Sequence, residues 1–282
     1  MNFDKQEISE LESRANAIRK DIVRMIANAG AGHPGGSLSI VEVIVCLYFK
    51  LMRLDPTNPH WPERDRFILS KGHSSPTVYA ALAELGFFSK DHLMTFDHVN
   101  SILQGHPDMK CTPGIDMSTG SLGQGLSAGL GMALAGRLKK KDFHIYVLMG
   151  DGELQEGQVW EAVMLADKYR IDNLTVIIDE NKLQLMGPID QLMPASRPMP
   201  EKWRAFGWNV LEMDGHKIPE ILETLTLARN MRGGPCVVFS HTVKGKGVSF
   251  MENQTGWHSR ALTADELSKA LSELSKFDEE AR

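Results

Sequence analysis

The chain has 282 residues, 42% of them hydrophobic and 24% charged, with a formal net charge of −5 at pH 7. This length and composition predict an enzyme-sized chain that buries a substantial core in one domain, residues 1–282, and the negative charge disfavours nucleic acid as the main partner. No apolar run approaches the roughly 20 residues that cross a bilayer, and Met1 begins a polar stretch, so we expect no membrane insertion or secretion. Three cysteines, an odd count without metal-ligand spacing, favour structural thiols and a cytoplasmic location.

The first part of the chain predicts two helices and a strand. Apolar residues recur at helical spacing over residues 8–26 and stop near Gly30, whose position fits a helix end, so this helix should deliver His33 to the site. Residues 40–51 read as a second, largely apolar helix. Residues 66–69 read as the first strand.

The middle of the chain alternates helices and strands. Residues 121–138 are rich in Gly and Ala and predict a tightly packed helix, either against the sheet or against another protomer. The apolar run 145–149 predicts a buried strand, followed by a helix from about 154 to 169. A second apolar run, 174–178, predicts the next strand.

The last part begins with a proline-rich stretch, residues 186–200, which we expect to be a long loop with little regular structure. Two further strands, 209–213 and 236–239, flank a helix at 218–231. The last helix, 262–277, begins at a capping-box pattern. Five strands with intervening helices predict an α/β fold with a parallel, doubly wound sheet flanked by helices.

Chemistry concentrates where two predicted strands end. Gly150-Asp151-Gly152 follows the strand 145–149, and its glycines let the backbone turn tightly and approach an anion. The helix that follows points free N–H groups at that anion. Asn181 lies just past the next strand, and the carboxyl ends of strands are where open α/β sheets bind ligands.

A metal ion fits the same place. The Asp151 carboxylate and the Asn181 amide oxygen are hard ligands suited to Mg²⁺ or Ca²⁺, and a backbone carbonyl near Leu183 adds a third. A single carboxylate ligand also makes electrostatic sense, because the metal must neutralise a polyanion and a second carboxylate would repel it.

This pattern resembles the thiamine-diphosphate fingerprint of transketolases and related enzymes. Further segments resemble transketolase in order along nearly the whole chain. They are Gly-His-Pro-Gly-Gly at 32–36, Ser-Lys-Gly-His at 70–73, Gly-His-Pro at 105–107, Thr-Gly-Ser-Leu-Gly-Gln-Gly at 119–125 and Trp-His at 257–258.

The resemblance implies a set of site residues. Thiamine diphosphate and Mg²⁺ or Ca²⁺ would be the cofactors, with Asp151, Asn181 and the main chain of Leu183 holding the metal. His33 and His258 would contact the substrate, His106 the reacting hydroxyls, and His73 and His258 the diphosphate. The cofactor-binding residues implied are His73, Gly120, Ser121, Leu122, Gly152, Glu153, Asn181 and His258.

Transketolase chemistry explains why imidazoles should converge. It moves a two-carbon ketol unit from a ketose to an aldose, and hydroxyl protons must leave and return near neutral pH, where imidazole titrates. The catalytic set implied is His33, His73, His106 and His258. The other histidines read as ordinary surface or core residues: His60, His92, His98, His144, His216 and His241. A Lys-Gly-Lys-Gly stretch at 244–247 lacks the spacing of a phosphate loop and reads as a mobile segment leading to His258.

The chain stops where a one-chain transketolase continues into a domain that grips the aminopyrimidine of the cofactor. The resemblance therefore implies the N-terminal, diphosphate-binding subunit of a split transketolase. A separate C-terminal subunit would complete a heterotetramer acting on sugar phosphates, pentose phosphates by default. Glu156 and Glu161 align with glutamates that link paired active sites. A truncated chain is the competing explanation, against which the initiator Met and the complete last helix count.

Other functions stay open. Deoxyxylulose-phosphate synthases and the α subunits of 2-oxo acid dehydrogenases share the metal motif, although segments 71–74 and 120–125 look more like transketolase. A specialised transketolase, for a sulfonated or branched sugar phosphate, is a second alternative. A non-catalytic homologue is a third, and the joint presence of Asp151, Asn181 and the four imidazoles argues against it.

Overall fold

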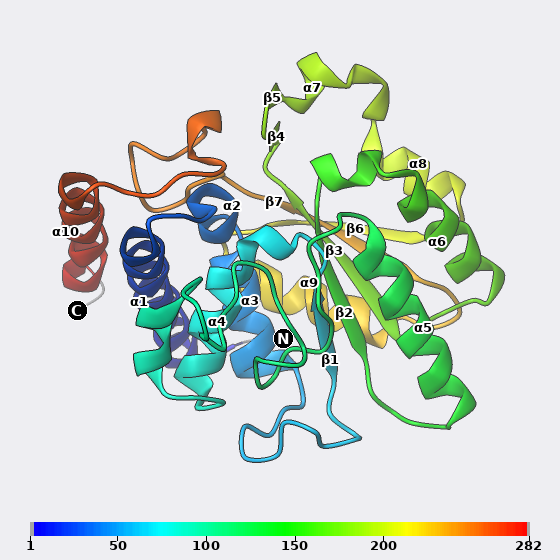
Figure 1. Ribbon diagram of the computed structural model, residues 1–282. Helices are drawn as coiled ribbons and strands as arrows, with labels where there is room; N and C mark the ends of the chain where they lie inside the picture. Colours follow the sequence, from blue (N-terminus) through cyan, green and yellow to red (C-terminus); the bar gives the residue numbers. More distant parts are fainter. Residues whose placement is uncertain (1–2, 281–282) are drawn as a thin grey trace.

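The computed structural model describes residues 3–280 of the chain, with side chains over 3–277. Within this range, one parallel sheet has the strand order β1-β2-β3-β7-β6 (Figure 1). The strands are β1 (Arg66–Leu69), β2 (Ile145–Gly150), β3 (Leu174–Glu180), β6 (Asn209–Asp214) and β7 (Cys236–His241). The predicted strands and the parallel α/β arrangement are confirmed, and β3 and β7 extend beyond their predicted ends.

The strand β2 and the middles of β3 and β7 are almost entirely apolar because helices cover both faces of the sheet. Along β2, successive side chains alternate between the two sides. Tyr146 and Leu148 belong to the core on one face, and Ile145, Val147 and Met149 to the core on the other. All five side chains are completely buried, so the sheet is doubly wound as expected.

The first face packs against helices from both halves of the chain, and the long helix α1 lies over them (Figure 1). Helix α1 ends at Gly30, whose φ of 69° is left-handed, as predicted for a helix end. The predicted helix 40–51 is present, although its last turn is a π-helix at Leu47–Leu51. The helices on this side are α1 (Lys5–Ala29), α2 (Pro34–Leu38), α3 (Val41–Cys46), α4 (Ser75–Leu85), α9 (Ile218–Asn230) and α10 (Ala264–Glu280).

The second face packs against α5 (Gln124–Leu138), α6 (Gly157–Lys168) and α8 (Met199–Ala205). Gly129 explains the small residues of α5: a Cβ there would lie 2.5 Å from Val147, so the helix backbone sits directly on the sheet. Helix α5 starts later than predicted, because Gly123 has a left-handed φ of 83°.

Two expectations about the fold are incomplete or wrong. Helix α4 was not predicted, since burial on every side leaves its sequence without an amphipathic period. The stretch 186–200 is not an irregular loop: it contains β5 (Gly187–Pro188), α7 (Ile189–Leu192), a 3₁₀ turn (Pro194–Ser196) and the start of α8. Its prolines lie in first turns or just before them, where a missing N–H costs no hydrogen bond. Short β4 (Leu183–Gln184) pairs with β5 above the sheet (Figure 1).

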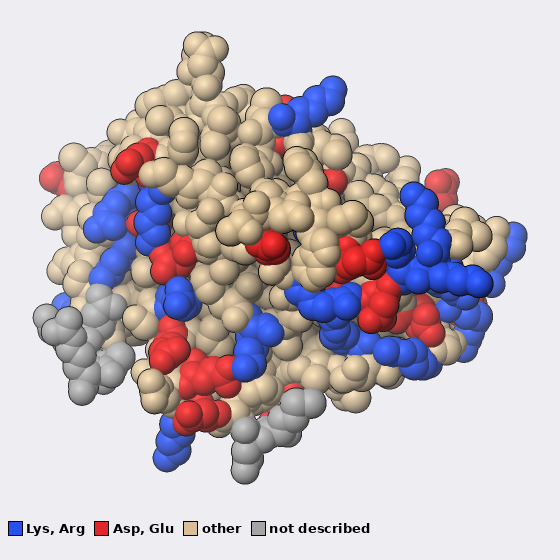
Figure 2. All heavy atoms as spheres, turned by 90° about the horizontal axis from the view of Figure 1, so that it is seen from below, with Lys and Arg blue, Asp and Glu red and all other residues tan. Residues whose placement is uncertain are grey.

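The remaining expectations concern the ends and the surface. The capping box is confirmed, because Glu266 N–H donates to Thr263 Oγ1 at 3.3 Å and Thr263 N–H donates to the Glu266 carboxylate at 2.9 Å. Cys111 is exposed and so is not a core thiol. Over residues 3–280 we find no helix whose length and hydropathy would let it cross a membrane. On the face seen in Figure 2, basic and acidic side chains are interspersed.

Candidate active site

The loops after four strands meet at the carboxyl edge of the sheet. Strands β2 and β3 are in register, with Gly150 opposite Asp179, so the turn after β2 lies beside the loop after β3. The Asp151 N–H donates to the Asp179 carbonyl at 3.2 Å, which joins the two loops directly. The loops after β1 and β7 reach the same place and carry Lys71 and Lys244.

The four motif histidines come together at this edge. The ring centroid of His33 lies 5.1 Å from that of His73, 6.2 Å from that of His106 and 5.6 Å from that of His258. The rings of His73 and His258 are 5.2 Å apart. His33 precedes α2, His73 lies in the 3₁₀ turn after β1, and His106 is an exposed loop residue. Segments far apart in the sequence thus form one imidazole cluster.

The electrostatics of the cluster favour neutral imidazoles. Burial, with added repulsion from His106, Lys244 and Lys71, lowers the pKa of His33 to about 4. Burial lowers the pKa of His258 to about 3, with Lys244 as the next contribution. The pKa of His73 falls well below its usual value for the same reasons. At neutral pH these three rings are therefore uncharged and can accept hydrogen bonds.

Lys71 is as deeply buried as Lys244, and each is 2% exposed. Its Nζ donates to the Gly36 carbonyl at 2.9 Å and contacts Asp179 Oδ2 at 2.5 Å. Asp179 is fully buried and also accepts from Ser39, Thr242 and the Asn181 amide. Burial raises the pKa of Asp179, but the Lys71 ammonium outweighs that effect and the net shift is downward. This buried ion pair therefore joins the loop after β1 to the end of β3 at the base of the site.

Lys244 faces the cluster from the loop after β7. Its Nζ is 2.8 Å from His258 Nδ1 and 3.2 Å from the Leu183 carbonyl oxygen. Burial, together with the charge of Lys71, lowers the pKa of Lys244 to about 8. Lys244 is almost fully buried, so the stretch expected to be a mobile lead-in is a packed turn.

The predicted metal ligands lie together. Asp151 Oδ1 accepts the Gly152 N–H at 2.8 Å and Oδ2 accepts the Lys182 N–H at 2.6 Å. Asn181 Oδ1 accepts the Leu183 N–H at 3.0 Å. One carboxylate, one amide oxygen and one carbonyl are the hard donors that Mg²⁺ and Ca²⁺ take.

The charge of Asp151 supports a cation at this position. Its side chain is only 2% exposed, and among the described residues it forms no ion pair. Burial, and next the Asp179 carboxylate, raise the pKa of Asp151 to about 7. A buried carboxylate without a counter-ion is costly, and a bound divalent cation removes that cost. Within residues 3–280 no cluster of three or more His, Cys, Asp or Glu side chains is arranged as a metal site, which agrees with this mixed donor set.

The predicted cofactor loop is open to solvent. Gly120, Ser121 and Leu122 are exposed, and Gly120 has a φ of 154°. A Cβ on Gly120 would lie 3.4 Å from the His106 ring, so the loop passes beside the imidazole cluster. Next to it, Thr119 Oγ1 is buried and has no hydrogen-bond partner among the described residues. An exposed glycine loop with an orphaned hydroxyl fits a bound polar ligand.

Glu153 was implied as a cofactor-binding residue, but its carboxylate is occupied by hydrogen bonds within the protein. Its carboxylate accepts the Gly123 N–H at 2.8 Å and the Gly150 N–H at 3.0 Å, and it also accepts from Ser70. The carboxylate therefore ties two glycine turns together instead of facing a ligand, and a diphosphate would repel it. Only the main chain of Glu153 is left for the cofactor.

Sequence reasoning assigned no role to Lys71, Lys244 or Asp179. The signal was present, because each follows or ends a strand at the edge where ligands bind. Glu156 and Glu161 are exposed, and their suggested role between paired sites stays a prediction. A cavity of about 720 Å³ opens beside His33 and His106, and its polar lining includes Asp97, Asp108 and Lys110.

Known proteins resemble this chain along nearly its whole length. The family described as transketolase, thiamine diphosphate binding domain, matches residues 11–280. A 6-deoxy-6-sulfo-D-fructose transketolase subunit of Clostridium sp. strain MSTE9 is 47% identical over 267 residues, which cover 95% of this chain and 97% of that protein. An apulose-4-phosphate transketolase subunit of Phocaeicola vulgatus is 44% identical, covering 96% of this chain and 95% of that protein.

Longer transketolases match as well. Human transketolase is 36% identical over 96% of this chain and 43% of its own length. The structure of transketolase from Campylobacter jejuni superposes with a TM-score of 0.89 and 31% identity, covering 98% of this chain and 43% of that one. This chain thus spans less than half the length of these two proteins. It belongs to the transketolase family, matching the thiamine diphosphate-binding domain along nearly its whole length.

Proposed function

We propose that this chain is the diphosphate-binding subunit of a two-chain transketolase, which transfers a two-carbon ketol unit from a ketose to an aldose. The observation that carries the proposal is the juxtaposition of the four imidazoles with the Asp151–Asn181 edge, since proton handling and anion binding must meet at one place. Its two shorter relatives, named as transketolase subunits, have nearly the same length.

The diphosphate end of the cofactor would be held by this chain. Asp151, Asn181 and the Leu183 carbonyl supply the ligands of Mg²⁺ or Ca²⁺, and Gly152 supplies an N–H for the diphosphate. The Lys244 ammonium donates to the Leu183 carbonyl oxygen at 3.2 Å, so this oxygen faces a positively charged group in the structure. Lys244 places a positive charge near the proposed diphosphate site, whereas the charge of Lys71 is paired with Asp179.

When bound, thiamine diphosphate supplies the nucleophilic carbon and the electron sink that carry the ketol unit. The chain's own part is positioning and proton transfer. His33 and His258, neutral at pH 7, can accept hydrogen bonds from the substrate hydroxyls whose protons move. His106 faces the cavity of about 720 Å³ and would contact the reacting hydroxyls, while His73 and His258 would contact the diphosphate.

A second polypeptide would complete the site. This chain covers 43% of human transketolase, and the relatives named as subunits indicate that members of this family also occur as separate chains. We propose that a pyrimidine-binding chain is the partner and that the assembly holds two copies of each chain. The exposed Glu156 and Glu161 would lie between paired sites.

The substrate is proposed as a class, a ketose donor with an aldose phosphate acceptor. The names of two relatives point to donors other than xylulose 5-phosphate, namely 6-deoxy-6-sulfo-D-fructose and the branched sugar apulose 4-phosphate. Xylulose 5-phosphate and these two sugars therefore form the donor panel for assay.

Reconstitution tests the proposal. The purified chain is assayed for ketol transfer alone and after mixing with a candidate pyrimidine-binding chain, sought in the neighbouring open reading frames, with thiamine diphosphate and Mg²⁺. We expect turnover of one donor of the panel only in the mixture. Steady turnover by the chain alone, with no second polypeptide detectable by mass spectrometry, would overturn the two-chain proposal. Pyruvate condensation with glyceraldehyde 3-phosphate would instead indicate a deoxyxylulose-phosphate synthase.

A further inference from the structure

The turn that carries Lys244 is held at both ends by side chains outside the site. Before Lys244, the Val243 N–H donates to His216 Nε2 at 2.9 Å. After it, the Lys246 carbonyl accepts from Arg19 Nε at 3.2 Å. His216 follows β6, and Arg19 lies in the middle of α1. Two segments that are distant in the sequence therefore hold this turn by hydrogen bonds.

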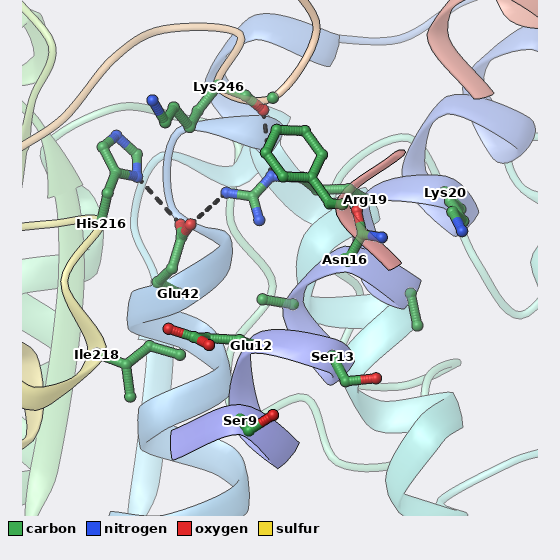
Figure 3. Close-up of a pocket in the computed structure, with 14 residues that line it drawn as sticks. Ser9, Glu12, Ser13, Asn16, Arg19, Lys20, Glu42, His216, Ile218 and Lys246 are labelled. Carbon is green, nitrogen blue, oxygen red and sulfur yellow. Dashed lines mark hydrogen bonds and ion pairs between the residues drawn. The ribbon is translucent and has the colours of Figure 1, made fainter. Parts of the chain in front are cut away.

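Arg19 and His216, which hold the two ends of the turn, both contact the Glu42 carboxylate. Glu42 Oε1 pairs with Arg19 Nη2 at 2.5 Å, and Glu42 Oε2 lies 3.1 Å from His216 Nδ1 (Figure 3). Glu42 is buried in α3; burial raises its pKa, but the Arg19 charge and the His216 hydrogen bond lower it to about 2. Glu42 is therefore ionised and available as an acceptor.

The hydrogen bonds settle the state of the His216 ring. A backbone N–H can only donate, so Nε2 accepts from Val243 and carries no proton. The ring proton is then on Nδ1 and donates to Glu42. Arg19 and His216 both donate to Glu42, and the Val243 N–H donates to His216, which leaves His216 a single tautomer and orientation.

Close packing allows the turn little freedom. Gly247 has a φ of 92°, and a Cβ there would lie 3.0 Å from the Arg19 side chain. The Gly245 N–H donates to the Gly35 carbonyl at 2.9 Å, beside His33. At the tip, Lys244 Nζ spans His258 Nδ1 and the Leu183 carbonyl. A shift of the turn would move the ammonium away from both.

We propose that His216 is a positioning residue. As the acceptor for Val243 N–H, backed by Glu42 and Arg19, it sets where the Lys244 ammonium stands in the site. This inference rests on the proposed function, in which that ammonium neutralises the cofactor diphosphate. His216 lies outside the cluster of His33, His73, His106 and His258, and its sequence context predicted only an ordinary histidine.

Two variants of His216 distinguish loss of the hydrogen-bond acceptor for Val243 from loss of the imidazole ring itself. In H216Q, the amide oxygen reaches the place of Nε2 and can still accept from Val243. In H216N, the shorter amide can donate to Glu42 as Nδ1 does but cannot reach Val243. As a control, His144→Asn removes a buried ring whose partner is Thr175, at the opposite edge of the sheet.

Two readouts are taken on the reconstituted two-chain complex. Hydrogen exchange followed by mass spectrometry reports on the peptide 242–251, and calorimetry gives the Kd for thiamine diphosphate with Mg²⁺. We expect H216N to exchange faster in this peptide and to bind the cofactor about 5-fold more weakly, the effect of one lost hydrogen bond. H216Q and the His144 control should match wild type in both, and kcat at saturating cofactor should hardly change.

Equal losses of affinity in H216N and H216Q, or wild-type affinity in H216N, would overturn the positioning role and leave the proposed function intact. An equal loss in the His144 control would also overturn it, because the effect would then be general destabilisation. If the wild-type complex does not bind thiamine diphosphate, the proposed function falls and this inference falls with it.

Discussion

Strand β2 has a buried polar region at each end, and the two differ in how their charges are satisfied. At the amino end, the fully buried Asp65 accepts from the Arg53 N–H at 2.9 Å and the His144 N–H at 2.8 Å, and it pairs with Arg229 at 2.8 Å. At the carboxyl end, Asp151 is as deeply buried, accepts two N–H groups and pairs with no cation among the described residues.

The difference shows in the acidity of the two carboxyls. Burial raises the pKa of both, but the Arg229 hydrogen bond and charge bring the pKa of Asp65 below its ordinary value. At Asp151, burial and the Asp179 carboxylate raise the pKa to about 7. A complete ion-pair network indicates a structural role, whereas the buried Asp151 without a counter-ion is the carboxylate that we propose binds a cation.

The largest contrast should come from neutralising each acid. Asp65→Asn leaves Arg229 and Arg53 short of a buried partner, so we expect the free energy of unfolding to fall by about 3–5 kcal/mol. Asp151→Asn removes an unpaired charge and should leave the metal-free chain at least as stable as wild type. Urea unfolding at pH 7.5 measures both. Equal destabilisation would show that Asp151 is structural.

Histidines at the two ends should separate in the same way. His106→Ala and His258→Ala should lower turnover of the reconstituted enzyme on the order of 10²-fold, because each removes a proton-handling group, while thermal stability changes little. His144→Ala should instead lower thermal stability and change turnover little. Steady-state kinetics and thermal melts decide, and normal specific activity in the two site variants would make those imidazoles structural.

A pH titration sharpens the contrast at the amino end. Burial, with Arg229 as the next contribution, lowers the pKa of His144 to about 3 from 6.5. The folded state thus binds fewer protons than the unfolded state between these values, so stability from this group is present above pH 6.5 and is lost as pH falls toward 3. The stability advantage of wild type over His144→Gln should shrink by about 2 kcal/mol between pH 7 and 4.5. Urea unfolding at both pH values checks this, and a constant advantage would contradict it.

At the carboxyl end of β2, much of the candidate site could be predicted from the sequence. Apolar runs located β2 and β3, and the polar residues directly after them, Asp151 and Asn181, mark a ligand-binding edge in parallel sheets. The four histidines were singled out because the segments that carry them resemble transketolase, and each lies next to a Gly, a Pro or a strand end. Local signals of this kind survive folding, since strand ends and turns are determined over a few residues.

Contacts between distant segments could not be anticipated. The pairing of Lys71 with Asp179 and the approach of Lys244 to His258 depend on how strands are ordered in the sheet, which no local pattern specifies. The same holds for His216, whose contact with Glu42 joins the turn after β6 to helix α3. Helix α4 escaped detection because burial on all sides removes the amphipathic period.

The central claim is that the Asp151 edge binds the metal and diphosphate of the cofactor. Calorimetric titration of the reconstituted complex with thiamine diphosphate, with and without Mg²⁺, tests it most directly in wild type and Asp151→Asn. We predict tight binding that requires Mg²⁺ in wild type, and a loss of affinity on the order of 100-fold or more in the variant, because the one charged protein ligand is gone. Equal, Mg²⁺-dependent affinity in both proteins would contradict the claim.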